Sequence, residues 1–212
     1  MSSPKPSYSN AALLIFGAGG HGRVVADAAM LENRWAAIVS SDRNTSLCQG
    51  ELLPSIPMRS PEEALSLNPV AHIAIGANRA REKEAELWGF KRLICIFHPA
   101  STVSRFSNIA AGCFVAAGAV IGPSVSLGLG VIINHGAVID HDVQIGAFSH
   151  IAPNATLGGG VTVGQRVLIG AGAVVMPSMT IVDDVTVGAG AVVCAHLVQA
   201  GTYAGIPARK IA

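Results

Sequence analysis

The sequence predicts an α/β domain over residues 11–98, a parallel β-helix over residues 99–194 and a short cap over residues 195–212. Three observations lead to this prediction. Apolar runs alternate with helix-like segments in the first part, a six-residue aliphatic period fills the second part, and that period stops after Val193. Residues 1–10 are polar and are expected to form a disordered N-terminus.

The first part indicates a small Rossmann-like sheet of parallel strands covered by helices. Ser60 followed by Pro61 indicates a helix start, because serine caps helices and proline suits the first helical position. Asn78 is expected to cap the last helix, and the proline-containing residues 43–60 are expected to form a loop. We expect strands over 11–16, 35–39, 71–75 and 93–97, and helices over 22–31 and 79–88.

The second part has an aliphatic residue at every sixth position. This spacing is typical of a parallel β-helix, in which each repeat supplies one strand and one corner. The aliphatic residue points inward, and the glycine that often follows it supplies corner conformations that a Cβ would obstruct. Valine, isoleucine or leucine occupies positions 103, 109, 115, 121, 127, 133, 139, 145, 151, 157, 163, 169, 175, 181, 187 and 193.

Three repeats close a coil of about 18 residues, so residues 103–193 predict about five coils stacked roughly 4.8 Å apart. The period continues without an insertion, so no long loop is expected in the walls of the β-helix. The period does not specify the hand of the helix.

Composition excludes several classes of protein. Half of the residues are hydrophobic and mean hydropathy is +0.50, yet no apolar run reaches about 18 residues, so no membrane span is expected. The polar start lacks the apolar core of a signal peptide, which favours a cytoplasmic location. The four cysteines form no Cys-x-x-Cys pair, and no metal is expected. The net charge of +1 without a basic run argues against a nucleic-acid partner.

A glycine-rich turn follows the first predicted strand. Gly17, Gly19 and Gly22 fit the G-x-G-x-x-G pattern, in which backbone N–H groups and a helix N-terminus favour a phosphate. Asp42 stands where a dinucleotide fold would place its ribose-binding acid. The domain is too short for the second half of such a fold, and a tight turn without a ligand is the alternative.

Three motifs carry a resemblance to a known family: Phe-Gly-Ala-Gly-Gly-His-Gly at 16–22, Ile-Asp-His-Asp at 139–142 and Gly-Ile-Pro-Ala-Arg at 205–209. The chain resembles the hexapeptide-repeat, left-handed β-helix acyltransferases. It is most similar to the bacillosamine-type sugar N-acetyltransferases, their perosamine relatives and the sialic acid O-acetyltransferases. The resemblance implies a homotrimer that uses acetyl-CoA and has its active sites between neighbouring subunits.

The resemblance also implies residues for the nucleotide-linked sugar. The glycine turn would hold the diphosphate, and Asp42 would lie near the uracil or ribose. Many relatives carry two adjacent acids where this chain has Ser41 and Asp42, which leaves the nucleotide base open. The substrate-binding positions implied are Gly19, Gly20, His21, Asp42, Gly76, Arg79 and Asn134.

His141 is the candidate catalytic base. Acyl transfer from a thioester to an amine needs a group that takes the proton of the acceptor. Asp140 and Asp142 flank His141, and a carboxylate can fix the tautomer of an imidazole and stabilise its charged form. By resemblance His141 is the base and Asp140 its orienting partner, and the acetyl group moves directly from donor to acceptor.

Register arithmetic places further residues around His141. Residues one coil apart stack, so Gly159 should lie over His141, leave room for the thioester and point its N–H towards the oxyanion. His150 lies half a coil from His141, so the two can share a site only across subunits. Arg209 and Lys210 could meet CoA phosphates or belong to a simple cap. The acetyl-CoA-binding positions implied by the resemblance are His150, Gly159, Ala171 and Ala189.

The predicted function is N-acetylation of the 4-amino group of a UDP-linked amino-dideoxy sugar, in polysaccharide biosynthesis or protein glycosylation. O-acetylation of sialic acid and N-acetylation of GDP-perosamine are alternatives within the family. A zinc carbonic-anhydrase-like site between subunits, a non-catalytic nucleotide-sugar-binding protein and a scaffold protein are the alternatives outside it.

Overall fold

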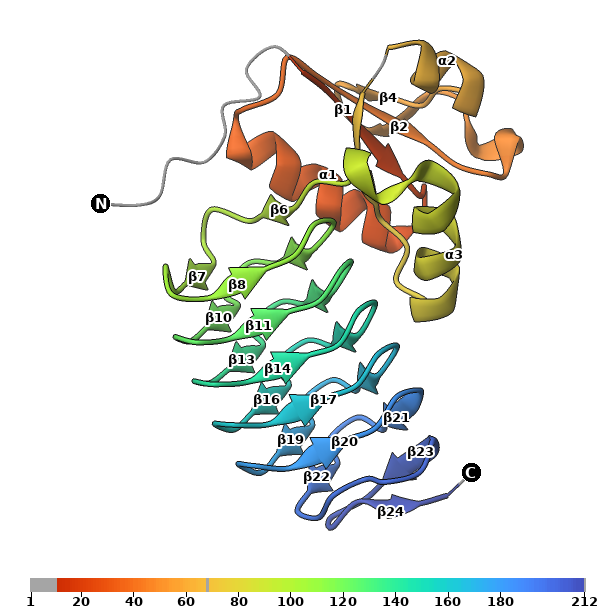
Figure 1. The fold of residues 1–212 in the computed structure, drawn as a ribbon. Helices are drawn as coiled ribbons and strands as arrows, with labels where there is room; N and C mark the ends of the chain where they lie inside the picture. The colour runs from red at the N-terminus through yellow and green to blue at the C-terminus, as the bar shows by residue number, and fades with distance from the viewer. Residues whose placement is uncertain (1–10, 68, 212) are drawn as a thin grey trace.

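The computed structural model describes residues 11–67 and 69–211. The predicted disordered N-terminus lies outside the described residues. Figure 1 shows an α/β domain seated on the first coils of a long parallel β-helix, with the C-terminal strands at the opposite end. The predicted fold class, an α/β domain followed by a β-helix of hexapeptide repeats, is confirmed.

The α/β domain is built on a three-stranded parallel sheet in the order β2-β1-β5. Its strands are β1 (Ala12–Phe16), β2 (Ala37–Ser41) and β5 (Val70–Ile73). Alternate residues of β1 point to opposite faces, as strand geometry requires. Leu13 and Ile15 pack against α1 (Gly20–Glu32), and Leu14 and Phe16 face α2 (Pro61–Ser66) and α3 (Asn78–Trp88).

Helix α1 also joins the sheet to the β-helix. Its buried residues Val25 and Ala29 share one hydrophobic cluster with Ile15 of the sheet and with Phe114 and Ile132 of the first coils. The α/β domain therefore sits on the β-helix through an apolar contact, and the glycine turn before α1 lies near that contact.

The segment predicted as a fourth strand over 93–97 contains a strand, but the assignment of that strand to the α/β sheet is wrong. Leu93 makes only an isolated bridge to Ala71, and Ile94 donates one backbone hydrogen bond to the Ala71 carbonyl before the chain leaves the sheet. Strand β6 (Ile96–Phe97) pairs instead with β9 (Phe114–Val115) and begins the β-helix. Strand β6 precedes the first position of the aliphatic period. The β-helix therefore has about six coils, one more than the five expected.

Two other local expectations differ from the structure. Residues 43–60 contain a 3-10 helix (Thr45–Leu47) and a hairpin of β3 (Glu51–Leu53) and β4 (Ile56–Pro57) in place of a plain loop. Asn78 is the first residue of α3 and not its cap; its side-chain amide donates to the carbonyls of Arg166 and Val167 in the β-helix. The Ser60 cap is present as predicted, in a reciprocal pair with Glu63.

The β-helix has three faces. We name two of them by their outward residues and the third by the α/β domain that covers it. The valine face contains β7 (Thr102–Val103), β10 (Val120–Ile121), β13 (Val138–Ile139), β16 (Thr156–Leu157), β19 (Val174–Val175) and β22 (Val192–Val193). The polar face contains β8 (Asn108–Ile109), β11 (Ser126–Leu127), β14 (Gln144–Ile145), β17 (Thr162–Val163) and β20 (Thr180–Ile181). The covered face, on which the α/β domain sits, contains β6, β9, β12 (Ile132–Ile133), β15 (His150–Ile151), β18 (Leu168–Ile169) and β21 (Val185–Val187).

The register follows the sequence period without a slip. Val120 pairs with Val138, and Ile139 pairs with Leu157, so each residue stacks on its equivalent in the next coil. From Val115 onward every aliphatic position of the period is buried in one continuous core. The hydrophobicity of the chain is therefore concentrated inside this prism. Among the described residues, no helix combines the length and apolarity needed to cross a membrane.

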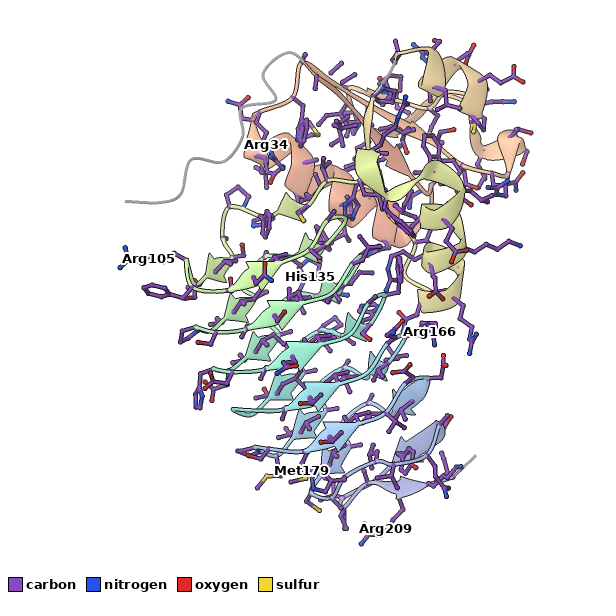
Figure 2. The ribbon with its side chains drawn as sticks, in the orientation of Figure 1. Arg34, Arg105, His135, Arg166, Met179 and Arg209 are labelled. Carbon is purple, nitrogen blue, oxygen red and sulfur yellow. The ribbon has the colours of Figure 1, made fainter. Side chains whose placement is uncertain are left out.

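The last coil is closed by two strands. Strand β23 (Gly201–Ala204) pairs in parallel with β21, and β24 (Arg209–Lys210) pairs antiparallel with β23. These strands cover the edge of β21, which would otherwise present unpaired backbone groups. Figure 2 places Arg209 at this end of the β-helix, far from His135 near the α/β domain.

Candidate active site

The glycine turn contains two glycines at which a side chain would clash with the backbone, and two at which the space for a side chain is empty. A Cβ at Gly17, where φ is +127°, would lie 2.6 Å from the Ala74 carbonyl oxygen, and a Cβ at Gly22 would overlap the Gly17 carbonyl oxygen. Gly19 and Gly20 have no atom within 4 Å of their Cβ positions. The turn thus presents open backbone at the N-terminus of α1, where N–H groups favour an anion.

This difference predicts that an alanine substitution lowers the stability of the protein much more at Gly22 than at Gly20. Gly22→Ala should lower the free energy of unfolding by about 1–3 kcal/mol or more, because its Cβ overlaps backbone. Gly20→Ala should change it by less than about 1 kcal/mol, because the methyl group meets open space in a helix. Urea unfolding followed by circular dichroism compares the two variants. Equal losses of stability would contradict the division between closed and open glycines.

Asp42 lies at the turn and orders it. Its Oδ2 accepts a hydrogen bond of 2.8 Å from the Ala18 N–H, and its Oδ1 accepts one of 2.9 Å from the Asn44 N–H. Gly76, like Gly19, has no atom near its Cβ position. Arg79 differs from expectation, because its guanidinium pairs with Asp184 of the β-helix at 2.8 Å. Helix α3 runs beside the β-helix, which directs Arg79 to that wall (Figure 1).

A cavity of about 370 Å³ adjoins the glycine turn. Phe16 and Trp88 form part of its wall, with ring centroids 5.2 Å apart, and Arg43 and Glu84 form a bidentate ion pair in it. Phe16 immediately precedes Gly17 and Arg43 immediately follows Asp42. The cavity therefore reaches the residue before the glycine turn at the end of β1 and the residue after Asp42 beyond the end of β2. The sequence motif did not reveal this relation.

His21 is a buried neutral imidazole. Its ring packs edge-on against Phe114 at 5.4 Å and lies 6.2 Å from the ring of His150. Burial, together with the charge of neighbouring histidines and Arg81, lowers the pKa of His21 to about 3. Its Nε2 is buried without a hydrogen-bond partner in the described part of the chain. His21 can therefore exchange a hydrogen bond with a ligand, but it brings no positive charge to the turn.

Asn134 and His150 form a pair at the upper end of the covered face. The Asn134 amide nitrogen lies 3.1 Å from His150 Nε2, and the backbone of Gly76 lies near the ring, where it opposes the fall of its pKa. Burial lowers the pKa of His150 to about 4. Since the amide donates to Nε2, the proton of the neutral ring resides on Nδ1.

His141 occupies an exposed corner between the valine face and the polar face. Its Nδ1 lies 2.8 Å from Asp142 Oδ2, whereas Asp140 Oδ1 accepts a hydrogen bond of 2.8 Å from the His141 backbone N–H. The structure thus assigns the orienting contact to Asp142 and not to Asp140. The bond to Asp142 and the charge of Asp140 both raise the pKa of His141.

Gly159 stacks over His141 as the register predicts, but the space it leaves is filled by the imidazole itself. A Cβ at Gly159 would lie 2.5 Å from His141 Cε1 and 2.6 Å from Nε2. The backbone is fixed beneath it, because the Gly160 N–H donates to the His141 carbonyl at 2.9 Å. Glycine at 159 therefore keeps Nε2, the nitrogen that Asp142 does not contact, free of a covering side chain.

The predicted site residues fall on both edges of the valine face. His141 and Gly159 lie on the edge shared with the polar face. On the opposite edge, backbone hydrogen bonds of consecutive coils link a column of corner residues, which we call the alanine column: His135, Pro153, Ala171 and Ala189. Asn134 adjoins the top of this column, so one chain does not bring His141 to Asn134 or His150.

A second cleft lies at the top of the alanine column. It has a volume of about 320 Å³ and separates α1 from the first coils, with Arg23, Asp27, His98 and His135 among its lining residues. No local motif predicts this cleft, because α1 and the corner residues are distant in the chain. No group of three or more His, Cys, Asp or Glu side chains within 11–67 and 69–211 is arranged to hold a metal ion.

Comparison with known families matches both parts of the chain. Residues 12–87 match the PglD N-terminal domain, and residues 142–177 match the bacterial transferase hexapeptide, in six repeats. No curated protein sequence matches the chain.

Several solved structures match nearly the whole chain. The acetyltransferase domain of PglB from Neisseria gonorrhoeae is 36% identical, with a TM-score of 0.87 over 95% of this chain and 100% of that chain, and one of its structures is a complex with acetyl coenzyme A. A mutant of the GDP-perosamine N-acetyltransferase of Caulobacter crescentus, in complex with CoA and GDP-perosamine, is 33% identical, with a TM-score of 0.85 over 96% of this chain and 98% of that chain. WeeI from Acinetobacter baumannii, at 19% identity and a TM-score of 0.59 over 94% and 99%, shares the fold.

Proposed function

The chain belongs to the family of hexapeptide-repeat sugar acetyltransferases, and on that premise we propose that it transfers an acetyl group from acetyl-CoA to the 4-amino group of a UDP-linked amino-dideoxy sugar. The observation that carries this proposal is the corner at His141, where a carboxylate-bound imidazole presents an uncovered nitrogen beside a glycine. The likeness to the PglB acetyltransferase domain, solved with acetyl coenzyme A, supports the choice of donor.

The chemistry follows from the two nitrogens of His141. Asp142 accepts the Nδ1 proton, which leaves Nε2 as the basic nitrogen. The sugar amine attacks the thioester carbonyl carbon while Nε2 takes a proton from the attacking nitrogen. The new C–N bond forms, the C–S bond breaks, and the proton passes from His141 to the departing CoA thiolate. No residue of the chain is acetylated in this direct transfer.

Self-association would complete the site. Val120, Val138 and Val174 form a mainly apolar stripe on the outside of the valine face, with Thr156 between the last two, and each valine is more than a third exposed. This stripe lies between His141 on one edge and the alanine column on the other. In a cyclic homotrimer the His141 edge of one chain can meet the alanine column of the next. Acetyl-CoA would then lie along Ala171 and Ala189, with its thioester near the neighbouring His141.

The nucleotide would bind to the α/β domain. The open backbone of Gly19 and Gly20 at the start of α1 offers N–H donors for a diphosphate. The adjacent cavity, with Phe16 and Trp88 in its wall, has the size and aromatic surface for a nucleobase. A GDP-linked amino sugar is the second candidate, because the 33% identical Caulobacter crescentus enzyme was solved with GDP-perosamine.

A thiol-release assay tests the proposal. The full chain is incubated with acetyl-CoA and with UDP- or GDP-linked 4-amino sugars, and free CoA is measured with a thiol reagent. Release that requires one of these sugars is expected, with a matching rise in melting temperature on adding that sugar alone. Stabilisation by the sugar without CoA release would indicate a nucleotide-sugar-binding protein. Neither effect across the panel would contradict the proposed function.

The pH dependence of turnover should reveal the contact between Asp142 and His141. As base, His141 must be neutral, so kcat/KM falls as the pH drops through its raised pKa. Asp142→Asn removes the largest cause of that rise and should move the acid limb to lower pH, while lowering the plateau about tenfold because the ring loses its orientation. Asp140→Asn should move the limb less. A larger effect of Asp140→Asn would contradict this assignment.

A further inference from the structure

Arg81 is a buried cation at the junction of the two domains. It lies on α3 with 1% of its surface exposed. Its Nη1 donates to the carbonyls of Ile75 and Gly76 at 2.8 and 2.9 Å, and its Nε donates to the Gly130 carbonyl at 2.8 Å. Its Nη2 donates to the carbonyls of Phe148 and Ser149 at 2.7 and 3.4 Å and to Asn78 Oδ1 at 3.0 Å.

These contacts join three separate segments. Ile75 and Gly76 belong to the loop between β5 and α3, Gly130 belongs to one corner of the β-helix, and Phe148 belongs to the next corner in the same column. No ion pair within the described residues includes Arg81, so backbone carbonyls and the Asn78 amide oxygen compensate its charge. Burial lowers the pKa of Arg81 to about 9, so the guanidinium remains charged at neutral pH.

A buried cation without a carboxylate is a costly way to join two domains. Well-packed apolar residues commonly stabilise such a junction as well or better. What an apolar side chain cannot do is fix the position and direction of several carbonyl groups at once. The planar fork of arginine does this, since it presents five donors in a rigid geometry.

The carbonyls that Arg81 holds surround His150. Phe148 and Ser149 are the two residues that precede His150 in the chain, and Gly76 lies near the His150 ring, where its backbone opposes the fall of the ring's pKa. The ring also meets the Asn134 amide at 3.1 Å. Arg81 thus fixes both the strand that carries His150 and the loop near its imidazole.

We propose that Arg81 is a positioning residue, which locks the Gly76 loop to the β-helix and thereby holds His150 in one orientation and one tautomer beside Asn134. The proposal rests on the proposed function and on the resemblance, which implies that His150 is one of the acetyl-CoA-binding positions. Arg81 itself does not touch the substrates. Its effect on acetyl transfer passes through the carbonyl of Gly76 and the ring of His150.

Arg166 provides a matched control. It also fastens α3 to the β-helix, with hydrogen bonds of 2.9 and 3.0 Å to Asp184 and one of 3.1 Å to Glu82 on α3. Figure 2 shows it at the lower end of α3. Its side-chain bonds go to residues other than the Gly76 loop and the strand before His150. Arg166→Met should therefore loosen the same helix without disturbing His150.

The test compares Arg81→Lys, Arg81→Met and Arg166→Met in the full chain labelled with ¹⁵N-histidine. The His150 signals are assigned with a His150→Gln variant. In the wild type His150 should show a protonated Nδ1 and an unprotonated Nε2. Arg81→Lys should give a mixture of tautomers and a loss of about ten- to a hundredfold in kcat/KM for acetyl-CoA, because lysine cannot hold all the carbonyls. Arg166→Met should keep the tautomer and kcat/KM while its melting temperature falls.

The outcomes separate the two proposals. A folded Arg81→Lys variant with the wild-type tautomer and kcat/KM would overturn the positioning role, whatever happens to its melting temperature. If Arg81→Met does not fold, Arg81→Lys decides the question alone. If the wild type shows no acetyl transfer, the proposed function fails, and the ¹⁵N spectra still report whether Arg81 sets the His150 tautomer.

Discussion

Replacing His141 with alanine is expected to lower kcat about 10²- to 10⁴-fold, the range that general-base catalysis contributes. The imidazole side chain is 58% exposed and makes no contact with the hydrophobic core, so the fold and melting temperature should change little. Thiol release at saturating acetyl-CoA and nucleotide sugar measures kcat, and thermal unfolding checks the fold.

A control on the same edge of the β-helix is His196, whose Nδ1 accepts a hydrogen bond from the Thr180 N–H. His196→Asn keeps an acceptor for that N–H and should retain nearly full turnover. Near-normal kcat in the His141→Ala variant would remove His141 from the chemistry. Equal losses in both variants would show that the whole edge, and not the base, had been disturbed.

The second large effect is expected at Gly159. Valine there would place its Cβ 2.5 Å from the His141 ring, so the imidazole must leave the position in which Asp142 orients it. We expect kcat to fall about a hundredfold or more, in line with the cost of a small misplacement of a reacting group. The Kd for acetyl-CoA, measured by calorimetry, should change much less than kcat, because the displaced group is the base.

Ala195→Val is the control, since it introduces the same residue at an exposed corner position after Val193, where the six-residue period has ended. This variant should keep the wild-type kcat. Unchanged turnover in Gly159→Val would contradict the stacking of Gly159 on the base. A selective loss of acetyl-CoA affinity would instead place the donor, and not the imidazole, against Gly159.

The β-helix could be predicted from sequence because one local rule generates it. Each inward position depends only on its own hexad, and the register between coils follows from the constant spacing, as the pairing of Ile139 with Leu157 shows. The partner of strand β6 escaped prediction because Ile96 and Phe97 have the apolar character of either a sheet strand or a first coil. Long-range pairing with Phe114 and Val115 decides between them.

The candidate site was predictable only where its signal is local. The glycine turn and the histidine with its flanking acids are contiguous motifs, but the motif does not say which acid contacts the ring. That choice depends on the corner: Asp142 adopts a left-handed conformation, with φ of 60°, and its carboxylate meets Nδ1. Arg81 gave no signal, because α3 contains several charged residues and only the packing of α3 beside the β-helix buries this one.

The division of the site between the two edges of the valine face is tested most directly with mixed oligomers. A His141→Ala chain and an Ala171→Trp chain, each expected to be inactive alone, are co-expressed with different tags, and oligomers that carry both tags are purified. If His141 of one chain serves the alanine column of the next, a cyclic trimer that carries both tags has both wild-type partners at one of its three interfaces. Acetyl transfer should then return to about that fraction of wild-type activity per site. A mixture no more active than its two parents would contradict a site shared between chains.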